Sequence, residues 1–375
     1  MVRVLQVFSS MNRGGAESMI MNYYRNINRD KIQFDFLVHR KEKGAFDDEI
    51  ERLGGKIFRV TQINPFFPSS YYNELRAFFK KYTNYKIIHS HLNTFSCFPL
   101  KIAHEFNIPF RIAHAHTATE KINFLDLFHP HHIKETLKKL TKAYLKKNIL
   151  TYTTQRMSCG KKAGEWLFGP NEDFIILNNA IDAKKFIYNE SIAKEYRKEF
   201  GYKNELIIGH IGNFSDAKNM PFLVQIFDAL LKENENCRLL LVGDGPQKQK
   251  FESDVKKLTI SHRVNFLGTR NDISNLCNLF DIFVFPSLYE GLPVTLIETQ
   301  ASGLKVFASK TITSDVALTT DLTFLPLSAS PQKWAEQIIQ QSSYKRKNNY
   351  ELIRSKGYDI MSNITLLENF YLSKK

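Results

Sequence analysis

The sequence predicts an α/β protein with two doubly wound parallel-sheet domains that face a cleft. The first observation is length, because 375 residues exceed one ordinary hydrophobic core and suit two domains of similar size. The second is composition, since 43% hydrophobic and 24% charged residues are typical of a folded chain. The third is the alternation of short β-branched or aromatic runs with longer helical patterns along the whole chain.

The predicted strands form two sets separated by helical patterns. The runs of the first half are residues 2–8, 32–39, 86–91, 111–116, 149–154 and 175–181. The runs of the second half are residues 206–213, 238–245, 264–269, 281–287, 304–309 and 323–327. Because strands that alternate with helices form parallel sheets, each set predicts one sheet covered by helices.

A polar, charge-rich stretch before residue 206 marks the expected domain boundary. The expected domains are residues 1–188 and 189–356, and a C-terminal helix follows over residues 357–375. In that helix, Met361, Ile364 and Leu367 recur at helical spacing and predict an apolar face.

The net charge of +14 is concentrated in the first half of the chain. Residues 1–185 contain 29 Lys and Arg against 17 Asp and Glu, a net charge of +12, which leaves +2 for the rest. Such a basic half suits a membrane surface or a phosphate-bearing partner, and a general solubility role stays open. Ile133, Leu137, Leu140 and Tyr144 predict the apolar stripe of a basic amphipathic helix, which suits a membrane surface or ordinary packing.

Cysteine usage and hydropathy give the expected compartment. The four cysteines form no CxxC pair and no repeated spacing, which favours a reduced, cytoplasmic protein. No apolar run approaches the roughly 18 residues of a membrane span, and the N-terminal run lacks a small-residue cleavage site. We therefore expect a cytoplasmic protein with peripheral contact to the inner face of the cell membrane.

The stretch EGLPVTLIETQ at residues 290–300 places two carboxylates around a predicted helix start. Pro293 suits the first helical turn, so the backbone N–H groups of residues 291–295 predict an anion site. Glu290 precedes this site, and Glu298 lies about one and a half turns inside the helix. Because carboxylates accept hydrogen bonds from paired hydroxyls, the arrangement suits a sugar on each side of a diphosphate. Both glutamates could equally be ordinary helix residues.

Other polar stretches follow predicted strands, where doubly wound sheets bind ligands. They are RGGAE, SHLN and HAHT in the first half, and GHIGNFSDAKN, VGDGP and FLGTRND in the second. With EGLPVTLIETQASGLKV, TTQRMSCGKKAGEWLFG and ILNNAID, their order and spacing resemble glycosyltransferase family 4, particularly its bacterial exopolysaccharide and capsule branch. The resemblance covers most of the chain. It implies the GT-B fold, retaining transfer from a nucleotide sugar, and a C-terminal helix that packs back onto the first domain.

The resemblance also implies roles for individual residues. Glu298 would bind the ribose hydroxyls and Glu290 the hydroxyls of the donor sugar, while Lys218 would stabilise the leaving diphosphate. His116 would lie near the anomeric carbon of the transferred sugar. We therefore predict His116, Lys218 and Glu290 as catalytic residues. The predicted donor-binding residues are Gly14, Gly15, Asn213, Lys218, Gly268, Arg270, Glu290, Gly291, Leu292, Pro293, Val294, Thr295 and Glu298.

One position departs from the family pattern. Asn213 stands where the family usually has arginine, so the diphosphate meets one cation fewer unless Arg270 or Arg13 compensates. No Asp-x-Asp motif occurs, so we expect neither a metal ion nor another cofactor. The histidine-rich run at residues 129–132 has no partner cluster that would complete a metal site. The roles of the polar residues in SHLN stay open.

The sequence thus predicts transfer of a hexose or N-acetylhexosamine, from a nucleotide sugar expected to be UDP-linked, to a lipid-linked or polysaccharide acceptor. The departure at Asn213 keeps open a non-catalytic accessory homologue, and the same fold also serves nucleotide-sugar epimerases. A nucleic-acid binder is the remaining alternative. We expect no nucleic-acid partner, because no basic strand face carries interleaved aromatic residues.

Overall fold

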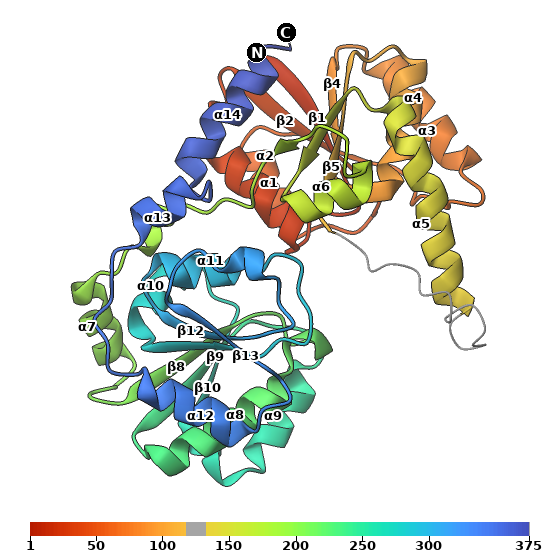
Figure 1. The fold of residues 1–375 in the computed structure, drawn as a ribbon. Coiled ribbons are helices and arrows are strands. Elements are labelled where there is room, and N and C mark those ends of the chain that lie inside the picture. Colours follow the sequence, from red (N-terminus) through yellow and green to blue (C-terminus); the bar gives the residue numbers. More distant parts are fainter. Residues whose placement is uncertain (118–132, 375) are drawn as a thin grey trace. The chain divides into compact units, whose positions relative to one another are not determined.

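The computed structural model describes residues 1–117 and 133–374, without the side chains of residues 133–140 and 142. The chain divides into two compact units (Figure 1). Unit 1 comprises Met1–Ala180 and Ile360–Lys375, and unit 2 comprises Ile181–Asp359. Among the described helices, none has the length and apolar character that a membrane span requires.

Unit 1 is built on a seven-stranded parallel sheet in the order β3-β2-β1-β4-β5-β6-β7. Its strands are β1 (Val2–Phe8), β2 (Ile32–Val38), β3 (Ile57–Arg59), β4 (Ile87–Ser90), β5 (Phe110–Ala115), β6 (Gln155–Ser158) and β7 (Ile175–Ile176). The central strands β1, β2 and β4 are almost entirely buried, as expected for parallel strands covered on both faces.

Helices cover both faces of the unit 1 sheet. They are α1 (Gly15–Asn26), α2 (Asp47–Arg52), α3 (Ser69–Lys81), α4 (Cys97–Glu105), α5 (Ile133–Tyr152), α6 (Lys161–Phe168) and α14 (Ile360–Leu372). One apolar core joins the sheet to α1 and the C-terminal helix α14, which lie side by side (Figure 1). A second core joins the other face to α3, α4, α5 and α6.

Unit 2 is built on a six-stranded parallel sheet in the order β10-β9-β8-β11-β12-β13. Its strands are β8 (Leu206–Ile211), β9 (Cys237–Val242), β10 (Val264–Gly268), β11 (Ile282–Phe285), β12 (Lys305–Ser309) and β13 (Leu322–Leu325). Its helices are α7 (Glu190–Glu199), α8 (Met220–Glu233), α9 (Lys248–Lys256), α10 (Ile273–Leu279), α11 (Val294–Ala301), α12 (Pro331–Gln340) and α13 (Tyr350–Ser355).

The strand order reverses beside the first strand of each unit. This switch point lies between β1 and β4 in unit 1, and between β8 and β11 in unit 2. Open α/β sheets bind ligands outside the carboxyl ends of the strands at such a point. The loops that follow these four strands are therefore the positions to search for a site.

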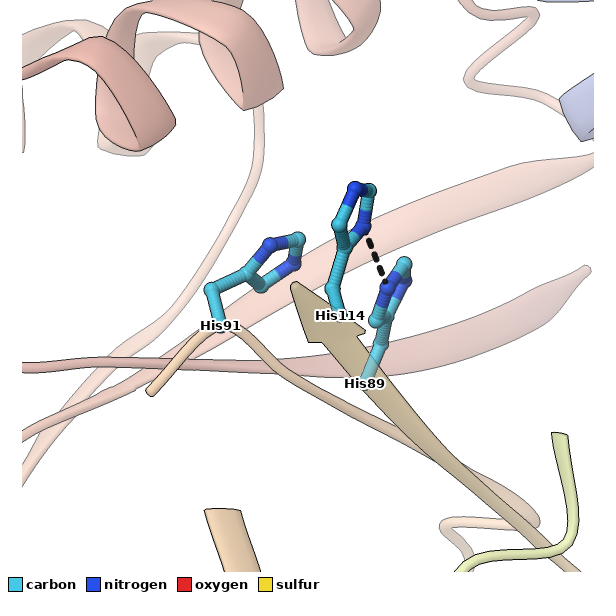
Figure 2. A group of neighbouring side chains, drawn as sticks. All are labelled: His89, His91 and His114. Atoms are coloured by element: carbon cyan, nitrogen blue, oxygen red, sulfur yellow. Dashed lines mark hydrogen bonds between the residues drawn. The ribbon is translucent and has the colours of Figure 1, made fainter. Parts of the chain in front are cut away.

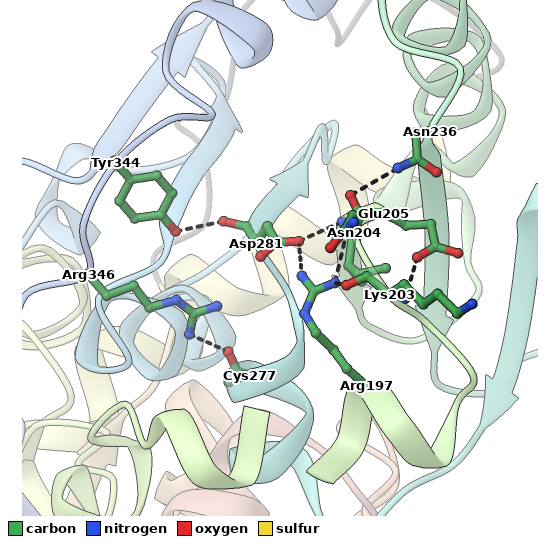
Figure 3. Close-up of polar contacts among 10 residues, drawn as sticks. Arg197, Lys203, Asn204, Glu205, Asn236, Cys277, Asp281, Tyr344 and Arg346 are labelled. Atoms are coloured by element: carbon green, nitrogen blue, oxygen red, sulfur yellow. Dashed lines mark hydrogen bonds and ion pairs between the residues drawn. The ribbon is translucent and has the colours of Figure 1, made fainter. Parts of the chain in front are cut away.

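A polar network lies at the amino-terminal ends of the unit 2 strands, opposite the carboxyl ends where ligands bind (Figure 3). Arg197 of α7 donates to the Asp281 carboxylate over 2.6 Å and to the Glu205 carbonyl over 3.0 Å. The Ile207 N–H donates to the same carboxylate over 2.8 Å, and the Tyr344 hydroxyl donates to the Asp281 carbonyl over 2.6 Å. Because Asp281 directly precedes β11 and Ile207 lies in β8, the network fixes both switch-point strands away from their ligand-binding ends.

The two units divide earlier in the chain than the expected boundary after residue 188. Ile181 and Phe186 pack in the apolar core of unit 2, and the Ile181 N–H donates to the Tyr358 carbonyl over 2.9 Å. Tyr358 belongs to the same core, so the C-terminal segment returns to unit 1 at Ile360 rather than at residue 357. Apolar packing, rather than local polarity, sets both boundaries.

One predicted strand, residues 149–154, is wrong. Its first four residues complete α5, and the next strand, β6, begins at Gln155. The β-branched and aromatic residues of this run suggested a strand. However, Leu145 and Ile149 are four residues apart and both buried, so the run extends the apolar face of the helix. The predicted run 175–181 forms only the two-residue strand β7.

In each of two predicted apolar helix faces, one assigned residue is wrong. In α5, Tyr144 is 68% exposed, whereas Leu145 is buried. In α14, Met361 is 51% exposed, whereas its neighbour Ile360 is fully buried. The rest of the predicted α5 stripe and the histidine-rich run at residues 129–132 lie outside the described side chains. In α14, the other two predicted residues, Ile364 and Leu367, are buried as expected. At each wrong position, two neighbouring apolar residues fitted the spacing, and packing selected one of them.

Candidate functional site

The loops that follow β8 and β11 meet at an ion pair. Lys218 Nζ lies 2.6 Å from Glu290 Oε1, and each side chain is 15% exposed. Lys218 Nζ also lies 4.5 Å from the centre of the Phe285 ring at the end of β11. The Leu288 N–H donates to the Ala217 carbonyl over 2.7 Å and joins the two loops. A cation and a carboxylate from separate stretches of sequence thus lie in contact at the switch point, where both are partly exposed.

Helix α11 begins directly after this ion pair. Pro293 precedes the helix as its cap residue instead of occupying the predicted first turn. In the described part of the chain, no acceptor faces the backbone N–H groups of Gly291, Leu292, Val294 and Thr295. A Cβ built on Gly291 would meet no atom within 4 Å, so the space at this position is open. These N–H groups and the positive end of the helix dipole can together bind an anion.

Glu298 lies one helical turn inside α11 and is half-buried. Burial raises the pKa of its carboxyl to about 7. Burial, and then the nearby Glu298 charge, raise the pKa of the Cys277 thiol on α10. Within the described residues, no hydrogen bond reaches the Glu298 carboxyl, so its oxygens remain available to ligand hydroxyls.

The loop after β8 packs closely against the loop after β9. A Cβ on Gly243 would clash with the Gly212 carbonyl, and a Cβ on Gly245 would clash with the Asn213 amide oxygen. These glycines therefore let the two loops approach each other, as expected for a small turn. Asn213, the residue that replaces the family arginine, lies exposed in this loop.

Two of the predicted donor-binding residues, Gly268 and Arg270, lie at the end of β10 and just after it. Gly268 has a positive φ of 64°, and its carbonyl accepts the Gly243 N–H over 2.8 Å. The Arg270 guanidinium contacts the Asp272 carboxylate at 2.9 Å and 2.6 Å, and the Tyr196 hydroxyl donates to the same carboxylate over 2.8 Å. Because this carboxylate already binds the guanidinium, Arg270 does not supply the missing cation in the observed conformation.

Unit 1 contains a cavity of about 340 Å³ at the carboxyl ends of β1, β2 and β4. Polar groups in its wall include Glu17, His39, His91 and Asn93. Burial raises the pKa of the Glu17 carboxyl and lowers the pKa of His39 to about 4. The cavity thus combines a carboxyl with two histidines and an amide at the switch point of this sheet.

The glycine pair after β1 leads directly into α1. Gly14 precedes the helix and Gly15 is its first residue, and neither has a positive φ. A Cβ on Gly15 would meet no atom within 4 Å, whereas a Cβ on Gly14 would clash with the Glu17 carboxylate. Open space beside Gly15, rather than an unusual backbone conformation, leaves room for a ligand here.

Histidines from the ends of β4 and β5 lie together in unit 1 (Figure 2). Nitrogen atoms of His89, His91 and His114 lie within 4.8 Å of one another, which is close enough to surround a metal ion. His116, the predicted catalytic histidine, contacts His91 over 2.8 Å. His116 was predicted from the sequence, but the cluster was not. The signal was the pair of patterns His-x-His in neighbouring strands, because alternate strand residues face the same side.

The fold and the site define the class of protein. Two doubly wound parallel-sheet units, each with polar groups at its switch point, form the GT-B fold. HepE of Anabaena, solved in complex with UDP-glucose, matches with a TM-score of 0.74 and 18% sequence identity over 100% of both chains.

Sequence comparisons give the family. The family model for glycosyl transferases group 1 matches residues 192–350. The chain is 36% identical over 378 residues to the putative glycosyltransferase EpsF of Bacillus subtilis, covering 98% of this chain and 96% of EpsF. It is 28% identical to CapH, a capsular polysaccharide biosynthesis glycosyltransferase of Staphylococcus aureus, over 100% of this chain and 99% of CapH. The chain therefore belongs to this glycosyltransferase family.

Proposed function

We propose that the protein transfers a hexose or N-acetylhexosamine from a UDP-linked donor to a lipid-linked or polysaccharide acceptor in capsule or exopolysaccharide synthesis. The observation that carries the proposal is the 2.6 Å pair of Lys218 and Glu290 in front of α11. Two comparisons support it, since HepE was solved with UDP-glucose and the printed name of CapH refers to capsular polysaccharide.

The site suggests how a donor is bound. Without a donor, Lys218 and Glu290 neutralise each other. A diphosphate in front of α11 would give Lys218 and the free N–H groups an anion to bind, and would let Glu290 turn to a sugar hydroxyl. Glu298, one turn further along, would accept the ribose hydroxyls. Asn213 would add hydrogen bonds but no charge.

Charge development explains why this arrangement would accelerate transfer. As the glycosidic bond breaks, negative charge grows on the leaving diphosphate. A fixed cation and a helix N-terminus stabilise that charge more in the transition state than in the ground state. Because Lys218 and α11 supply the positive charge, the proposal needs no metal ion. Retention of the anomeric configuration is also part of the proposal and rests on the resemblance to family 4.

Unit 1 has surface features that suit a lipid-linked acceptor at a membrane. Phe66 is 62% exposed and Phe67 is 78% exposed, so two aromatic rings project from one loop. A cavity of about 500 Å³ beside this loop is lined by Tyr72, Phe98 and Lys101, among others. Exposed aromatic rings in a strongly basic unit favour peripheral contact with anionic lipid.

Donor binding is tested by thermal unfolding with UDP-glucose, UDP-galactose, both UDP-N-acetylhexosamines and GDP-mannose. A bound nucleotide sugar should raise the melting temperature by mass action. Lys218→Ala and Glu290→Ala should reduce the shift. Lys333→Ala should not, because the Lys333–Glu336 pair of α12 is surface-exposed. The proposal fails if no UDP-sugar stabilises the wild type, or if all variants respond equally.

Catalysis is tested by incubating the stabilising UDP-sugar without acceptor, in the presence of a chelator. A transferase should release UDP slowly, and the first anomer detected by NMR should keep the donor configuration. An altered sugar would indicate an epimerase instead. Binding without any turnover, with or without candidate acceptors, would indicate the non-catalytic homologue that Asn213 motivates.

A further inference from the structure

A layer of polar side chains lies on one face of the unit 1 sheet, between strands and helices that otherwise pack apolar residues. Alternation along β1, β4 and β5 brings Gln6, His89, His91, His114 and His116 to the face covered by α1 and α14. Helix α14 adds Tyr371. Gln6, His89, His114 and Tyr371 have no exposed surface. Because burying a polar group costs free energy unless it is hydrogen-bonded, the partners of these side chains define their states.

A chain of hydrogen bonds runs from α14 to the end of β5. Gln6 Nε2 donates to the Tyr371 hydroxyl oxygen over 3.3 Å, which turns Gln6 Oε1 towards His91. Gln6 Oε1 lies 2.9 Å from His91 Nε2. His91 Nδ1 lies 2.8 Å from His116 Nε2. The chain thus has the order Tyr371, Gln6, His91 and His116.

The direction of each hydrogen bond follows from the chemistry of the groups. An amide oxygen only accepts, so His91 Nε2 must carry a proton. A neutral imidazole has one N–H, so His91 Nδ1 accepts and His116 Nε2 donates. His116 Nδ1 then carries a bare lone pair. These proton positions hold for neutral rings. Burial keeps both rings neutral, because it lowers the pKa of His116 to about 3 and that of His91 well below its usual value.

The lone pair of His116 lacks a hydrogen-bond donor. His116 Nδ1 is buried and has no partner among the described residues. The backbone N–H of His116 donates to Asn93 Oδ1 over 2.8 Å. Because Asn93 lines the 340 Å³ cavity, this hydrogen bond holds His116 next to the cavity wall. A fixed, unpaired acceptor of this kind suits a ligand hydroxyl.

We propose that Gln6 and His91, oriented by Tyr371, are positioning residues that lock His116 in the tautomer with a bare Nδ1, and that this atom accepts a hydrogen bond from a hydroxyl of the sugar substrate. The hydroxyl contact rests on the proposed function, whereas the tautomer does not. A site built to pair a hydroxyl discriminates strongly against an analogue that lacks it. The hydrogen-bond chain from Tyr371 to His116 would therefore contribute to selection of the sugar.

The competing interpretation of the same residues is a metal site. His89 Nδ1 lies 2.6 Å from the Tyr371 hydroxyl, and His89 Nε2 lies 3.1 Å from His114 Nδ1, the contact drawn in Figure 2. Both nitrogens of His91 are also engaged, so His114 Nε2 is the one unpaired ring nitrogen of the trio His89, His91 and His114 in the described structure. A metal ion would have to break several of these hydrogen bonds.

The tautomer is tested by NMR on the full chain with ¹⁵N-labelled histidine, with signals assigned through His116→Gln. In the wild type, His116 Nδ1 should be unprotonated and Nε2 protonated. Gln6→Met keeps the size but removes the acceptor, and should give His91 and His116 mixed tautomers. Gln6→Glu keeps an oxygen towards His91 and should preserve the wild-type tautomer. Gln33→Met is the matched control, because Gln33 is also buried in this sheet but donates to the Leu53 carbonyl instead.

Two NMR results would overturn the proposal. One is a wild-type His116 with its proton on Nδ1, and the other is an unchanged tautomer in Gln6→Met. Stoichiometric zinc binding that shifts the signals of His89, His91 and His114 would also overturn it, in favour of a metal site.

The hydroxyl contact is tested separately by comparing UDP with UDP-glucose in titrations. Gln6→Met should leave UDP affinity unchanged and weaken UDP-glucose by about tenfold, the effect of one lost hydrogen bond. Equal weakening of both ligands would contradict the sugar contact. If wild-type protein binds neither ligand, the proposed function fails, while the NMR result still decides the tautomer.

Discussion

Lys218 and Glu290 were expected to contact different parts of the donor, the diphosphate and the sugar. Both were predicted as ligand contacts, but in the structure they form a 2.6 Å ion pair. Removing one partner leaves the other charge partly buried and unpaired. Effects of single substitutions here therefore combine lost ligand contacts with a changed charge on the remaining residue.

Lys218→Ala should lower the turnover number by roughly 10²-fold to 10³-fold, because the leaving diphosphate loses its fixed cation. The measurement is the initial rate of transfer or of UDP-sugar hydrolysis at saturating donor. Lys333→Ala, which removes an exposed cation of the same unit, should keep the wild-type rate. A change of less than about twofold in Lys218→Ala would argue against the assigned role.

Glu298 should make donor binding dependent on pH. Its carboxyl has a pKa of about 7 because of burial, and hydroxyl donors would favour the ionised form. Affinity for UDP-glucose should therefore rise with pH, by at most about tenfold per unit, and level off above about pH 7. Titration calorimetry from about pH 5.5 to about pH 8 measures this, since UDP-glucose has no phosphate that titrates in the range.

Glu298→Gln is the control for this pH dependence and should give a flat profile. An unchanged slope in that variant would assign the titration to another group. Folding stability should depend on pH in the opposite direction to donor affinity. Because the pKa of Glu298 is raised from 4.5 in the folded protein, its ionisation lowers the free energy of unfolding as pH rises through about 7.

At the scale of elements, the close approach of two loops in unit 2 requires glycine. Gly243 has a φ of 139°, and a Cβ there would clash with the Gly212 carbonyl. Gly243→Ala should therefore lower the free energy of unfolding by about 1–3 kcal/mol, through backbone strain and steric overlap. Urea unfolding measures this loss. Gly291→Ala, with no atom within 4 Å of the added carbon, should keep wild-type stability, and equal losses in the two variants would contradict the argument.

The C-terminal helix α14 offers a second test at this scale, because two adjacent leucines differ in burial. Leu367 is fully buried in the core of unit 1, whereas Leu366 is 46% exposed. Leu367→Ala should cost about 2–5 kcal/mol of unfolding free energy, and Leu366→Ala about 0.5 kcal/mol or less. Thermal or urea unfolding of the full chain compares them. A larger loss in Leu366→Ala would mean that the helix packs in a different register.

For the whole molecule, the uneven charge should direct association with membranes. Binding to vesicles that contain anionic lipid should exceed binding to neutral vesicles and should weaken as salt rises. Replacing Phe66 and Phe67 with serine should reduce binding further, since both rings are exposed. Met361→Ser, which removes an exposed apolar side chain of α14, is the control. Co-sedimentation measures binding, and equal binding to neutral vesicles would contradict the charge argument.

The fold class followed from the sequence because strand and helix periods are local properties. The ends of the helices and strands were predicted less well from the sequence. The run at residues 149–154 has strand-like composition, yet it completes α5 because Ile149 faces the core together with Leu145. For the same reason, Tyr144 of α5 and Met361 of α14 were wrongly assigned to apolar faces, whereas their neighbours Leu145 and Ile360 are buried. Local periodicity allowed more than one register, and only packing against the sheet distinguished them.

The sequence by itself determined two parallel-sheet units, and it predicted the loops after the strands as ligand positions and a helix start at residues 290–295. Tertiary structure decided what those residues do to one another. It placed Lys218 against Glu290, buried Glu298 enough to raise the pKa of its carboxyl, and joined Gln6 to His116 through His91. The physical reason is distance along the chain, because hydrogen bonds and desolvation act between neighbours in space, and strand order alone makes distant residues neighbours.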